Sequence, residues 1–452
     1  MEQITTLSLF FIGLVLLVGF GLFGFTSFSE GEKRATRVSF SLAGLGAVLF
    51  FLGAILPYAF GVFLLGIIVA LAATFAVLFL LPIGKIPMGQ DEPQQRVDER
   101  DIMFARARLK PGSPEYSAYY QKRPENKTID DRTRAKPGLL SHESRLANPF
   151  LFASPKGSFG LTEALWEAVD GPLSEDRQTL SPEKTTDYLK GLARYYGALD
   201  VGITELKPTH VYSHIGRGSG TYGAPIPVEH AYALAFTVEM DFQMLGPSPA
   251  PQVTMESGKQ YVEAARIAVQ LANTIRYLGY PARAHIDSNY RVIAPLVARD
   301  AGLGEIGRMG LIMTPKQGPR VRLGMVTTNI ELIPDGRQPD PSVIDFCNIC
   351  NKCAENCPSK SIPLGDRAEI DGALRWKIDA ETCFHYWNVI GTDCARCMAV
   401  CPYSHPDSFS HNLIRWGNSR SGFFRRGANW MDDLFYGRKP APRQAPEWTH
   451  IP

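Results

Sequence analysis

Two cysteine-rich stretches, CNICNKCAENCP at residues 347–358 and CARCMAVCP at residues 394–402, decide the fold of the C-terminal part of this 452-residue chain. The first spaces its cysteines as Cys-x2-Cys-x2-Cys-x3-Cys-Pro. The second repeats the last part of that pattern, and Cys383 precedes it with ten residues between. All eight cysteines of the chain lie between residues 347 and 401, so they form one constellation.

This spacing is typical of two [4Fe–4S] clusters. Three closely spaced thiolates hold three corners of one cube, and the cysteine before the proline ligates the other cluster. We therefore predict that Cys347, Cys350, Cys353 and Cys401 bind cluster 1, and that Cys357, Cys383, Cys394 and Cys397 bind cluster 2. Two zinc sites need only paired Cys-x2-Cys units, and disulfides are rare in a reducing cytoplasm. Two adjacent clusters conduct single electrons, which indicates a redox enzyme or an electron carrier.

The N-terminal segment is a predicted membrane anchor of residues 1–84. No charged residue occurs from residue 4 to 29 or from residue 38 to 84, and one helical span needs about 20 apolar residues. Pro57 divides the second run. We therefore predict three spans, at about residues 4–28, 38–56 and 60–81.

Positive charge predicts the orientation of these spans. An odd number of spans places the loop 30–37 and everything after residue 84 on one side. That side carries Lys33, Arg34, Arg37, Lys85, Arg96 and Arg100. Such charges favour the cytoplasm, so we expect an inner-membrane protein whose large domain faces the cytoplasm and whose anchor contacts membrane lipid. The first apolar run lacks the basic start and the cleavage site of a secretory signal.

The rest of the chain alternates predicted strands and helices, which indicates an α/β (α+β) fold. We expect strands at 231–240 and 320–330, and a helix at 257–278 whose start Ser257 caps. Residues 85–154 are polar and Pro-rich, so they are interpreted as an extended linker and wrapping segment. Residues 155–338 form the predicted α/β domain, 339–410 a ferredoxin-like domain and 411–452 a C-terminal tail. The net charge of +2 gives no basis for nucleic-acid binding.

A literal GLGEIG at residues 302–307 does not have the context of a dinucleotide-binding fingerprint. That fingerprint follows a strand and opens a helix, with an acidic residue some twenty positions later. Here a helical pattern precedes it, Pro315 would end any helix after it, and no Asp or Glu occurs between Glu305 and Glu331. A glycine-lined loop beside another cofactor stays open, with Gly302 and Gly304 as its contacts.

Several segments in this order resemble the corrinoid and iron–sulfur reductive dehalogenases and, more weakly, the epoxyqueuosine reductases. They are VYSHIGRG (211–218), TVEMD (237–241), IRYLGY (275–280), AGLGEIGR (301–308) and both cysteine stretches. Respiratory members carry a twin-arginine export signal and use a separate three-span anchor protein. This chain instead has the spans fused at its N-terminus, where Glu30-Gly31-Glu32 resembles the Glu-x-Glu loop of that anchor.

The resemblance implies a nitroreductase-like core that holds a cobalt corrinoid of the cobalamin type in its base-off form. It implies replacement of halogen by hydrogen in an organohalide, with halogenated aromatics among the candidates. Ferredoxin, flavodoxin or quinol would supply the electrons through the two clusters.

The resemblance also implies site residues. In the family, a tyrosine four residues after a Ser or Thr donates the proton, and Ser257 and Tyr261 match that pattern. A basic residue about sixty positions later lies beside it. Arg320 and Arg322 both fit, because side chains two apart on a strand share a face, and Arg320 is preferred. His214 and Asn289 are expected to line the corrinoid pocket, with His210 nearby.

Two other functions fit part of the pattern. An epoxyqueuosine-reductase-like enzyme would share the corrinoid and clusters, but that family normally uses an aspartate as its proton donor and acts on transfer RNA. A membrane-bound iron–sulfur electron-transfer protein without its own substrate would need the spans and clusters, but not the α/β domain before them.

Overall fold

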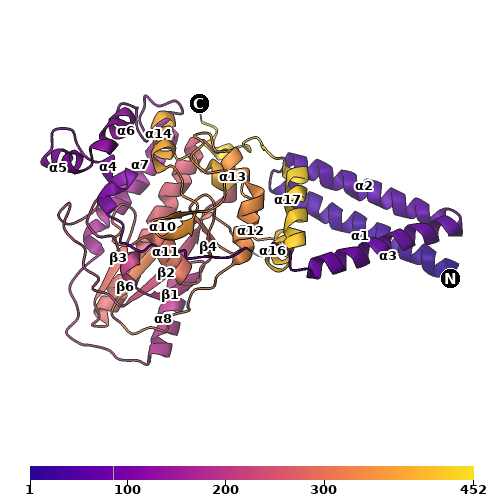
Figure 1. Ribbon diagram of the computed structural model, residues 1–452, viewed down its shortest axis with the longest axis horizontal. Coiled ribbons are helices and arrows are strands. Elements are labelled where there is room, and N and C mark those ends of the chain that lie inside the picture. Colours follow the sequence, from indigo (N-terminus) through magenta and orange to yellow (C-terminus); the bar gives the residue numbers. More distant parts are fainter. Residues whose placement is uncertain (85, 452) are drawn as a thin grey trace. The chain divides into compact units, whose positions relative to one another are not determined.

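The computed structural model describes residues 1–84 and 86–451, so Lys85 of the charge argument lies outside the described residues. The chain divides into two compact units (Figure 1). The anchor unit comprises Met1–Ile86, Pro341–Cys350 and Asp407–Gln444. The sheet unit comprises Pro87–Asp340, Asn351–Pro406 and Ala445–Pro452. The five-part division expected from the sequence stays a prediction.

Three helices of the anchor unit match the predicted spans. They are α1 (Glu2–Ser29), α2 (Lys33–Ile55) and α3 (Tyr58–Leu80). Among the described residues, these three helices are long and apolar enough to cross a membrane. The start of α2 lies five residues before the predicted boundary, because charged residues extend a helix beyond its apolar stretch. The backbone N–H of Thr36 already donates to the carbonyl oxygen of Glu32 (2.9 Å).

The anchor unit also contains helices from the C-terminal half of the chain. These are α12 (Pro341–Cys350), α16 (Phe409–Arg420) and α17 (Gly422–Tyr436). The last two correct the expectation of a tail from residue 411. A buried ion pair joins α12 to α17, since Arg425 Nε lies 2.6 Å from Asp345 Oδ2.

Four strands of the sheet unit form an antiparallel sheet in the order β1-β2-β6-β3. Their bounds are β1 (Val201–Glu205), β2 (Tyr232–Glu239), β3 (Ala282–His285) and β6 (Val321–Thr328). The predicted strands at 231–240 and 320–330 are thereby confirmed. Because neighbouring strands are antiparallel, the fold is α+β rather than a parallel α/β fold.

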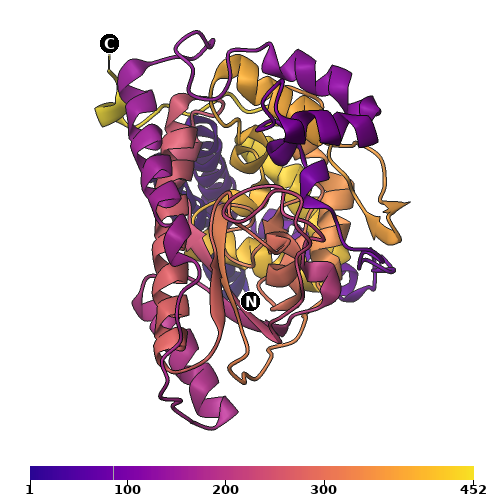
Figure 2. The ribbon, with the colours of Figure 1, turned by 90° about the vertical axis from the view of Figure 1, so that its left-hand side faces the viewer.

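Helices cover both faces of this sheet. On one face α8 (Pro182–Tyr195) and α10 (Pro251–Tyr277) bury Leu234, Phe236 and Val326, and on the other α11 (Ala294–Asp300) buries Ala235 and Met325. Figure 2 shows α7 (Pro149–Ala164) beside α10. The start of α10 lies six residues before the predicted one, because Pro251 suits the first helical position, where its missing N–H costs nothing. Ser257 is therefore an interior residue and does not cap the helix.

The segment predicted as extended contains helices. They are α4 (Met103–Arg106), α5 (Pro114–Lys122) and α6 (Pro124–Arg134). Proline at the first turn starts α5 and α6. The polar composition of α5 and α6 gave no helical signal in the sequence, because most of their residues face solvent while Tyr119 and Tyr120 are buried.

The remaining elements are short. The helices are α9 (Phe242–Leu245), α13 (Lys352–Glu355), α14 (Ala380–Ile390) and α15 (Arg396–Ala399), and the strands are β4 (Glu305–Ile306), β5 (Ile312–Met313), β7 (Ala368–Ile370) and β8 (Ala373–Arg375). The 3-10 turns are η1 (Glu99–Asp101), η2 (Trp166–Ala168), η3 (Pro208–His210), η4 (Pro402–Ser404) and η5 (Glu447–Thr449).

Close contact between β6 and α10 depends on Gly324. A Cβ there would lie 2.4 Å from the Phe236 ring and 3.1 Å from the Ala264 carbonyl oxygen. We expect Gly324→Ala to destabilise the sheet unit by about 1–3 kcal/mol, because the helix must move. Gly191→Ala in α8, where a Cβ meets nothing within 4 Å, should stabilise by up to about 1 kcal/mol. Thermal unfolding of both variants checks the difference, and equal midpoints would contradict it.

Candidate active site

Four cysteines of the sheet unit lie within electrostatic reach of one another. Burial, and then the charges of Cys394 and Cys357, raise the pKa of Cys383 to about 12. Burial also raises the pKa of Cys394 to about 11, with Cys357 adding to it. Burial raises the pKa of Cys397 well above its usual value, and the charges of Cys394, Cys353, Cys383 and Cys357 add to it. Cys357 and Cys394 are buried and Cys383 and Cys397 are partly buried. Thiols that disfavour one another's charge suit a shared cationic centre, as an iron–sulfur cluster provides.

The other four cysteines occupy two units. Cys347 and Cys350 lie on α12 of the anchor unit, Cys353 lies on α13 and Cys401 precedes η4. All eight cysteines are free of disulfide bonds. The ligand set of cluster 1 stays a prediction.

Tyr261 lies in the interior of α10, ten residues after Pro251. The expected start at residue 257 would place Tyr261 near the N-terminus of the helix. That start is wrong, so the helix dipole, which acts over the first turn, does not reach Tyr261. Within the described part of the chain, no residue forms a hydrogen bond with the Tyr261 hydroxyl. The side chain that acts on it is Arg322, whose guanidinium carbon lies 4.9 Å from the ring centroid.

Arg322 is held by two residues from different elements. Its Nη2 donates to Ser257 Oγ (2.6 Å) and lies 3.5 Å from Asp393 Oδ2. The Ser257 hydroxyl in turn donates to Asp393 Oδ2. Asp393 directly precedes Cys394, so the loop that carries a predicted cluster ligand also orients the cation beside Tyr261.

Arg320 does not contact Tyr261, and the preference for Arg320 is corrected. Its Nε donates to the Ser404 carbonyl oxygen (2.9 Å), and its Nη1 lies 2.7 Å from Glu239 Oε1. Arg320 precedes β6, so its guanidinium reaches the end of the sheet, whereas Arg322 lies opposite Val238 within the ladder. The rule that residues two apart share a face does not distinguish the positions of these two guanidinium groups.

Burial determines the protonation of the candidate proton donor. It raises the pKa of Tyr261 to about 12, against the lowering effect of Arg322. Tyr290 is partly buried, and both its burial and the charge of Tyr261 raise its pKa well above the usual value. Tyr261 therefore keeps its proton throughout the neutral range.

His214 and Asn289 lie beside a glycine-rich loop at residues 216–223. His214 Nδ1 is 3.3 Å from Asp98 Oδ2 at a partly exposed position. Asn289 is fully buried, and its Oδ1 accepts from the backbone N–H and hydroxyl of Ser219. Both positions thus have structural partners, and their corrinoid contacts stay predictions.

The buried side chain of Glu99 supports the glycine-rich loop at residues 216–223, and the sequence analysis missed it. Its side chain accepts hydrogen bonds from the N–H groups of Gly216 and Arg217 and from Arg217 Nε (3.1 Å). In the sequence it is one acid in a charged segment, so no local signal distinguishes it.

Gly302 and Gly304 have a packing role. Gly304 has φ of 152°, and a Cβ there would lie 2.2 Å from the Met313 carbonyl oxygen. Gly302 also has positive φ, and its Cβ would lie 3.1 Å from the Gly336 carbonyl oxygen. Since α11 precedes them and only the two-residue strand β4 follows, the rejection of a dinucleotide fingerprint is supported.

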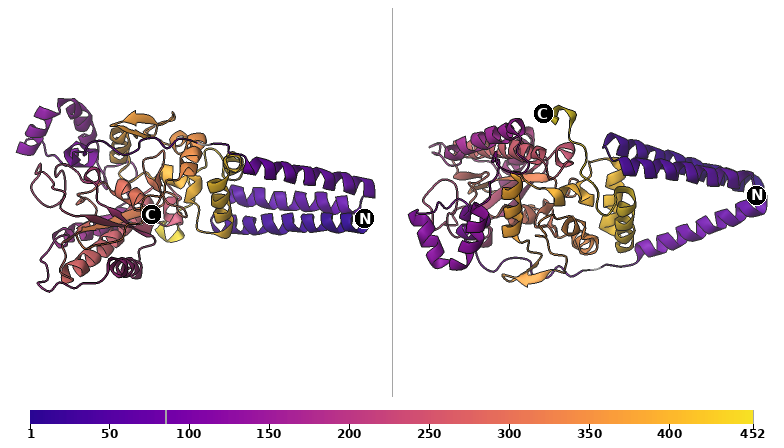
Figure 3. Two further views of the ribbon diagram at one scale, coloured as in Figure 1. Left: turned by 60° about the horizontal axis from the view of Figure 1, so that its bottom comes forward. Right: turned by 90° about the horizontal axis from the view of Figure 1, so that it is seen from above.

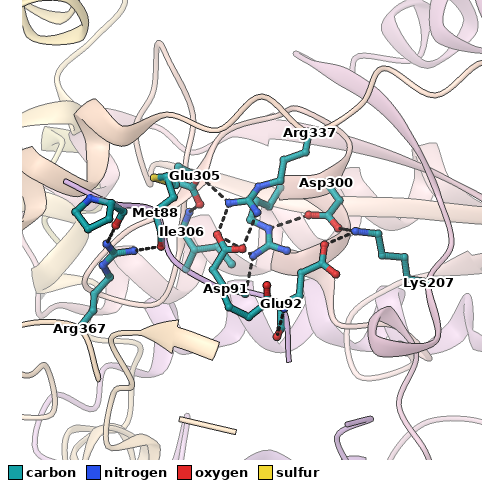
Figure 4. Close-up of polar contacts among 12 residues, drawn as sticks. Met88, Asp91, Glu92, Lys207, Asp300, Glu305, Ile306, Arg337 and Arg367 are labelled. Carbon is teal, nitrogen blue, oxygen red and sulfur yellow. Dashed lines mark hydrogen bonds and ion pairs between the residues drawn. The ribbon is translucent and has the colours of Figure 1, made fainter. Parts of the chain in front are cut away.

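An ion-pair network surrounds this glycine element (Figure 4). Arg337 pairs with Asp91 and lies 3.3 Å from Glu305 Oε2. Asp300 contacts Lys207 Nζ (2.9 Å), His210 Nε2 (3.0 Å) and Arg299 Nε (2.8 Å). The network therefore fixes the start of the sheet unit to α11 and β4, and it gives His210 a structural role.

Asp300 is the buried centre of this network, so we expect Asp300→Asn to destabilise the protein by about 3–5 kcal/mol. Burial alone would raise its pKa, but the His210 hydrogen bond and the charges of Arg299 and Lys207 lower it below the usual value. The stabilisation is therefore complete above about pH 4 and decreases as the pH falls further.

Thermal unfolding against pH checks this. The difference in unfolding free energy between wild type and Asp300→Asn should decrease on acidification. Glu92→Gln, which removes a partly exposed partner of Lys207, is the control and should cost less than about 1 kcal/mol. A pH-independent difference would exclude the carboxylate as its source.

Comparisons with known proteins agree with this geometry. Residues 346–405 match the 4Fe-4S dicluster domain family. The chain is 31% identical over 306 residues to a tetrachloroethene reductive dehalogenase of Sulfurospirillum multivorans, covering 59% of this chain and 60% of that protein. An epoxyqueuosine reductase of Listeria monocytogenes is 30% identical over only 128 residues, covering 25% of this chain and 30% of that protein.

A solved structure extends the likeness to the fold. The catabolic reductive dehalogenase NpRdhA, in complex with 3-bromo-4-hydroxybenzoic acid, has a TM-score of 0.61 and 25% sequence identity, covering 79% of this chain and 52% of that one. This chain therefore spans about half to three fifths of the length of these relatives. The resemblance of the chain to the reductive dehalogenases is confirmed in sequence and in fold.

Proposed function

We propose that this protein is a membrane-anchored, corrinoid-dependent reductive dehalogenase. The reaction replaces a halogen on carbon by hydrogen, consuming two electrons and one proton and releasing halide. The observation that carries the proposal is the Tyr261 hydroxyl, which has no hydrogen-bond partner among the described residues. Arg322 lies over its ring, and the Ser257–Asp393 pair connects Arg322 to the loop of Cys394.

The residues around Tyr261 fit a bound corrinoid. Arg322 Nε is buried without a hydrogen-bond partner, so the polypeptide alone leaves this site incomplete. Arg108 and Arg291 have no carboxylate partner among the described residues, and burial lowers the pKa of both, with the Arg217 charge adding to the effect. We propose that these cations hold the phosphodiester of the corrinoid's nucleotide loop, with His214 and Asn289 beside the same glycine-rich loop. The family resemblance supports a nitroreductase-like core and the base-off form.

Tyr261 acts as the proton donor. A bound corrinoid would supply the low-valent cobalt chemistry that carbon–halogen cleavage requires. Tyr261 Oη then gives its proton to the substrate carbon and becomes a phenolate. Burial makes that anion costly, and the guanidinium of Arg322, oriented by Ser257 and Asp393, offsets the cost. Solvent protons restore the phenol after each turnover.

Electrons reach this site through two [4Fe–4S] clusters in the predicted ligand sets. Cys347 and Cys350 belong to the unit that contains the spans, which supports cluster 1 as the point of electron entry. With the large domain on the cytoplasmic face of the inner membrane, soluble ferredoxin or flavodoxin, or quinol from the bilayer, would serve as donor.

The substrate is an organohalide, and we propose a halogenated aromatic. The ligand named for NpRdhA, a bromohydroxybenzoic acid, supports this class, while the Sulfurospirillum relative is named for a chlorinated alkene. The partly buried guanidinium groups of Arg217 and Arg322 favour a phenolate or carboxylate on the ring. An electron-transfer protein without its own substrate would leave Tyr261 and Arg322 without a role.

The first test concerns Tyr261. Tyr261→Phe should lower the dehalogenation rate by about 10²–10⁴-fold, because the proton donor is lost while the ring remains. Tyr277→Phe, an exposed tyrosine on the same helix, is the matched control and should leave the rate unchanged. Release of halide from bromophenols and chlorophenols, with corrinoid and iron content checked, is the measurement. A normal rate in Tyr261→Phe would refute the assignment.

The same assay tests the charge of Arg322. Arg322→Gln should lower kcat, and Arg322→Lys should restore part of it by keeping the cation. If the lysine variant is no better than the glutamine variant, the charge of Arg322 is not what the reaction uses.

The second test measures cofactor content. Anaerobically reconstituted protein should contain about eight irons and one cobalt per chain. Cys394→Ser should lose about four irons, because its cluster loses a ligand from a buried set. Iron and cobalt analysis with an absorbance spectrum gives both values. Eight irons without cobalt, after corrinoid is supplied, would favour the electron-transfer alternative.

A further inference from the structure

Helices α16 and α17 lie at one end of the membrane spans and are fixed there by polar contacts. His411 Nε2 is 3.1 Å from both carboxylate oxygens of Glu30, at the end of α1, and this pair is buried. Arg34 Nε, in the first turn of α2, donates to the Leu434 carbonyl oxygen (3.0 Å). These contacts hold both C-terminal helices against the turn between the first two spans.

The third span reaches the same helices through aromatic rings. The first half of α3 packs on α1 and α2, where Leu64 and Leu65 contact the cluster of Leu9 and Phe50. Its last turns diverge from them, and α17 lies across the open end (Figure 3). There Phe79 stacks on Trp416 (6.0 Å between ring centroids).

The length of α3 indicates how deep in a bilayer these aromatic contacts lie. The 23 residues of α3 rise roughly 34 Å, close to the ~30 Å hydrocarbon thickness of a bilayer. Phe79 is in the last turn of α3, so it lies at the boundary between hydrocarbon and headgroups. The helices that pack on it lie at the same level.

Each of the two helices has an apolar stripe at helical spacing. On α16 the stripe is Phe409, Leu413 and Trp416, all exposed, and Arg420 continues it. On α17 it is Phe423, Gly427, Trp430, Met431 and Leu434, of which Trp430 is 66% exposed. The two stripes are continuous with the rings that contact α3, because Trp416 and Phe423 belong to both. They therefore extend the apolar surface of the span instead of facing water.

Basic residues border these stripes. Residues 407–444 have a net formal charge of +4, whereas the whole chain has +2. Arg420, Arg426 and Lys439 are exposed, and the Arg420 guanidinium lies over the Trp416 ring (4.8 Å). Tryptophan beside arginine at the end of a span is typical of the membrane–water interface.

We propose that α16 and α17 form a lipid-binding platform that lies in the headgroup region and prefers anionic phospholipid. Trp416 and Trp430 enter the acyl-chain boundary, and Arg420 and Lys439 contact lipid phosphates. The platform is independent of the proposed enzymatic function, because it rests on the anchor unit alone.

Quenching of tryptophan fluorescence by brominated lipid tests the placement. The full-length protein is reconstituted in bilayers of phosphatidylcholine and phosphatidylglycerol, brominated either near the headgroup or near the chain end. We expect Trp416→Phe and Trp430→Phe each to remove part of the quenched emission, with headgroup-proximal bromine the stronger quencher. Trp376→Phe, at a site only 6% exposed, is the control and should leave the quenched emission unchanged. Equal quenching in wild type and both variants would overturn the proposal.

A second quenching experiment, in which only one of the two lipid classes carries bromine, tests the preference for anionic lipid. Brominated phosphatidylglycerol should quench about twofold more than brominated phosphatidylcholine at equal fraction, because each basic residue attracts an anionic headgroup. The ratio should approach one in the Arg420→Gln, Lys439→Gln double variant and in high salt. A ratio of one in the wild type would refute the anionic preference.

Discussion

A guanidinium buried between a sheet and a helix needs an acidic partner, and this constraint organises the sheet unit. Arg322 points from β6 toward α10, and neither element supplies an acid to it. The acid is Asp393, from the loop between α14 and α15, and Ser257 bridges the two. Removing one partner of such a pair destabilises the fold by far more than the intact pair stabilises it, because the other charge stays buried without a partner. The loop with the predicted cluster ligands is therefore bound to the α+β sheet at the position of Tyr261.

The need for an acidic partner from elsewhere in the fold also explains which parts of the site can be predicted from the sequence. Cysteine spacing and the Ser257-x3-Tyr261 pattern are local, so they identify Cys394 and Tyr261 without a structure. The choice between Arg320 and Arg322 depends on which guanidinium finds an acid across the fold, and no local pattern encodes that. Glu99 is a similar case, because its importance comes from the backbone N–H groups of a loop more than a hundred residues away.

The same difference between local sequence signals and distant contacts applies to the fold. Long uncharged runs predicted the three spans, since hydrocarbon admits few alternatives to an apolar helix. The helices of residues 114–134 were missed, because their polar composition matches that of a surface loop. Those of residues 409–436 were missed although their apolar residues recur at helical spacing. What makes them helices is their partners: α6 buries Asp130 against Arg106, and α17 buries Arg425 against Asp345. Tertiary contacts thus decide structure where the hydrophobic signal is weak.

The partly buried position of Tyr261 has opposite effects on the two halves of a proton-donation cycle. Burial raises its pKa to about 12, so the phenol is fully protonated at any physiological pH, yet the same burial disfavours the phenolate that donation leaves. A cation close to the ring resolves the conflict, because it stabilises the anion without supplying an acceptor that would hold the hydroxyl. Arg322 contacts the face of the ring, not its oxygen, so the hydroxyl stays available to a substrate. A cation at hydrogen-bond distance from that oxygen would instead lower the pKa of the phenol and occupy the position where the substrate carbon must lie.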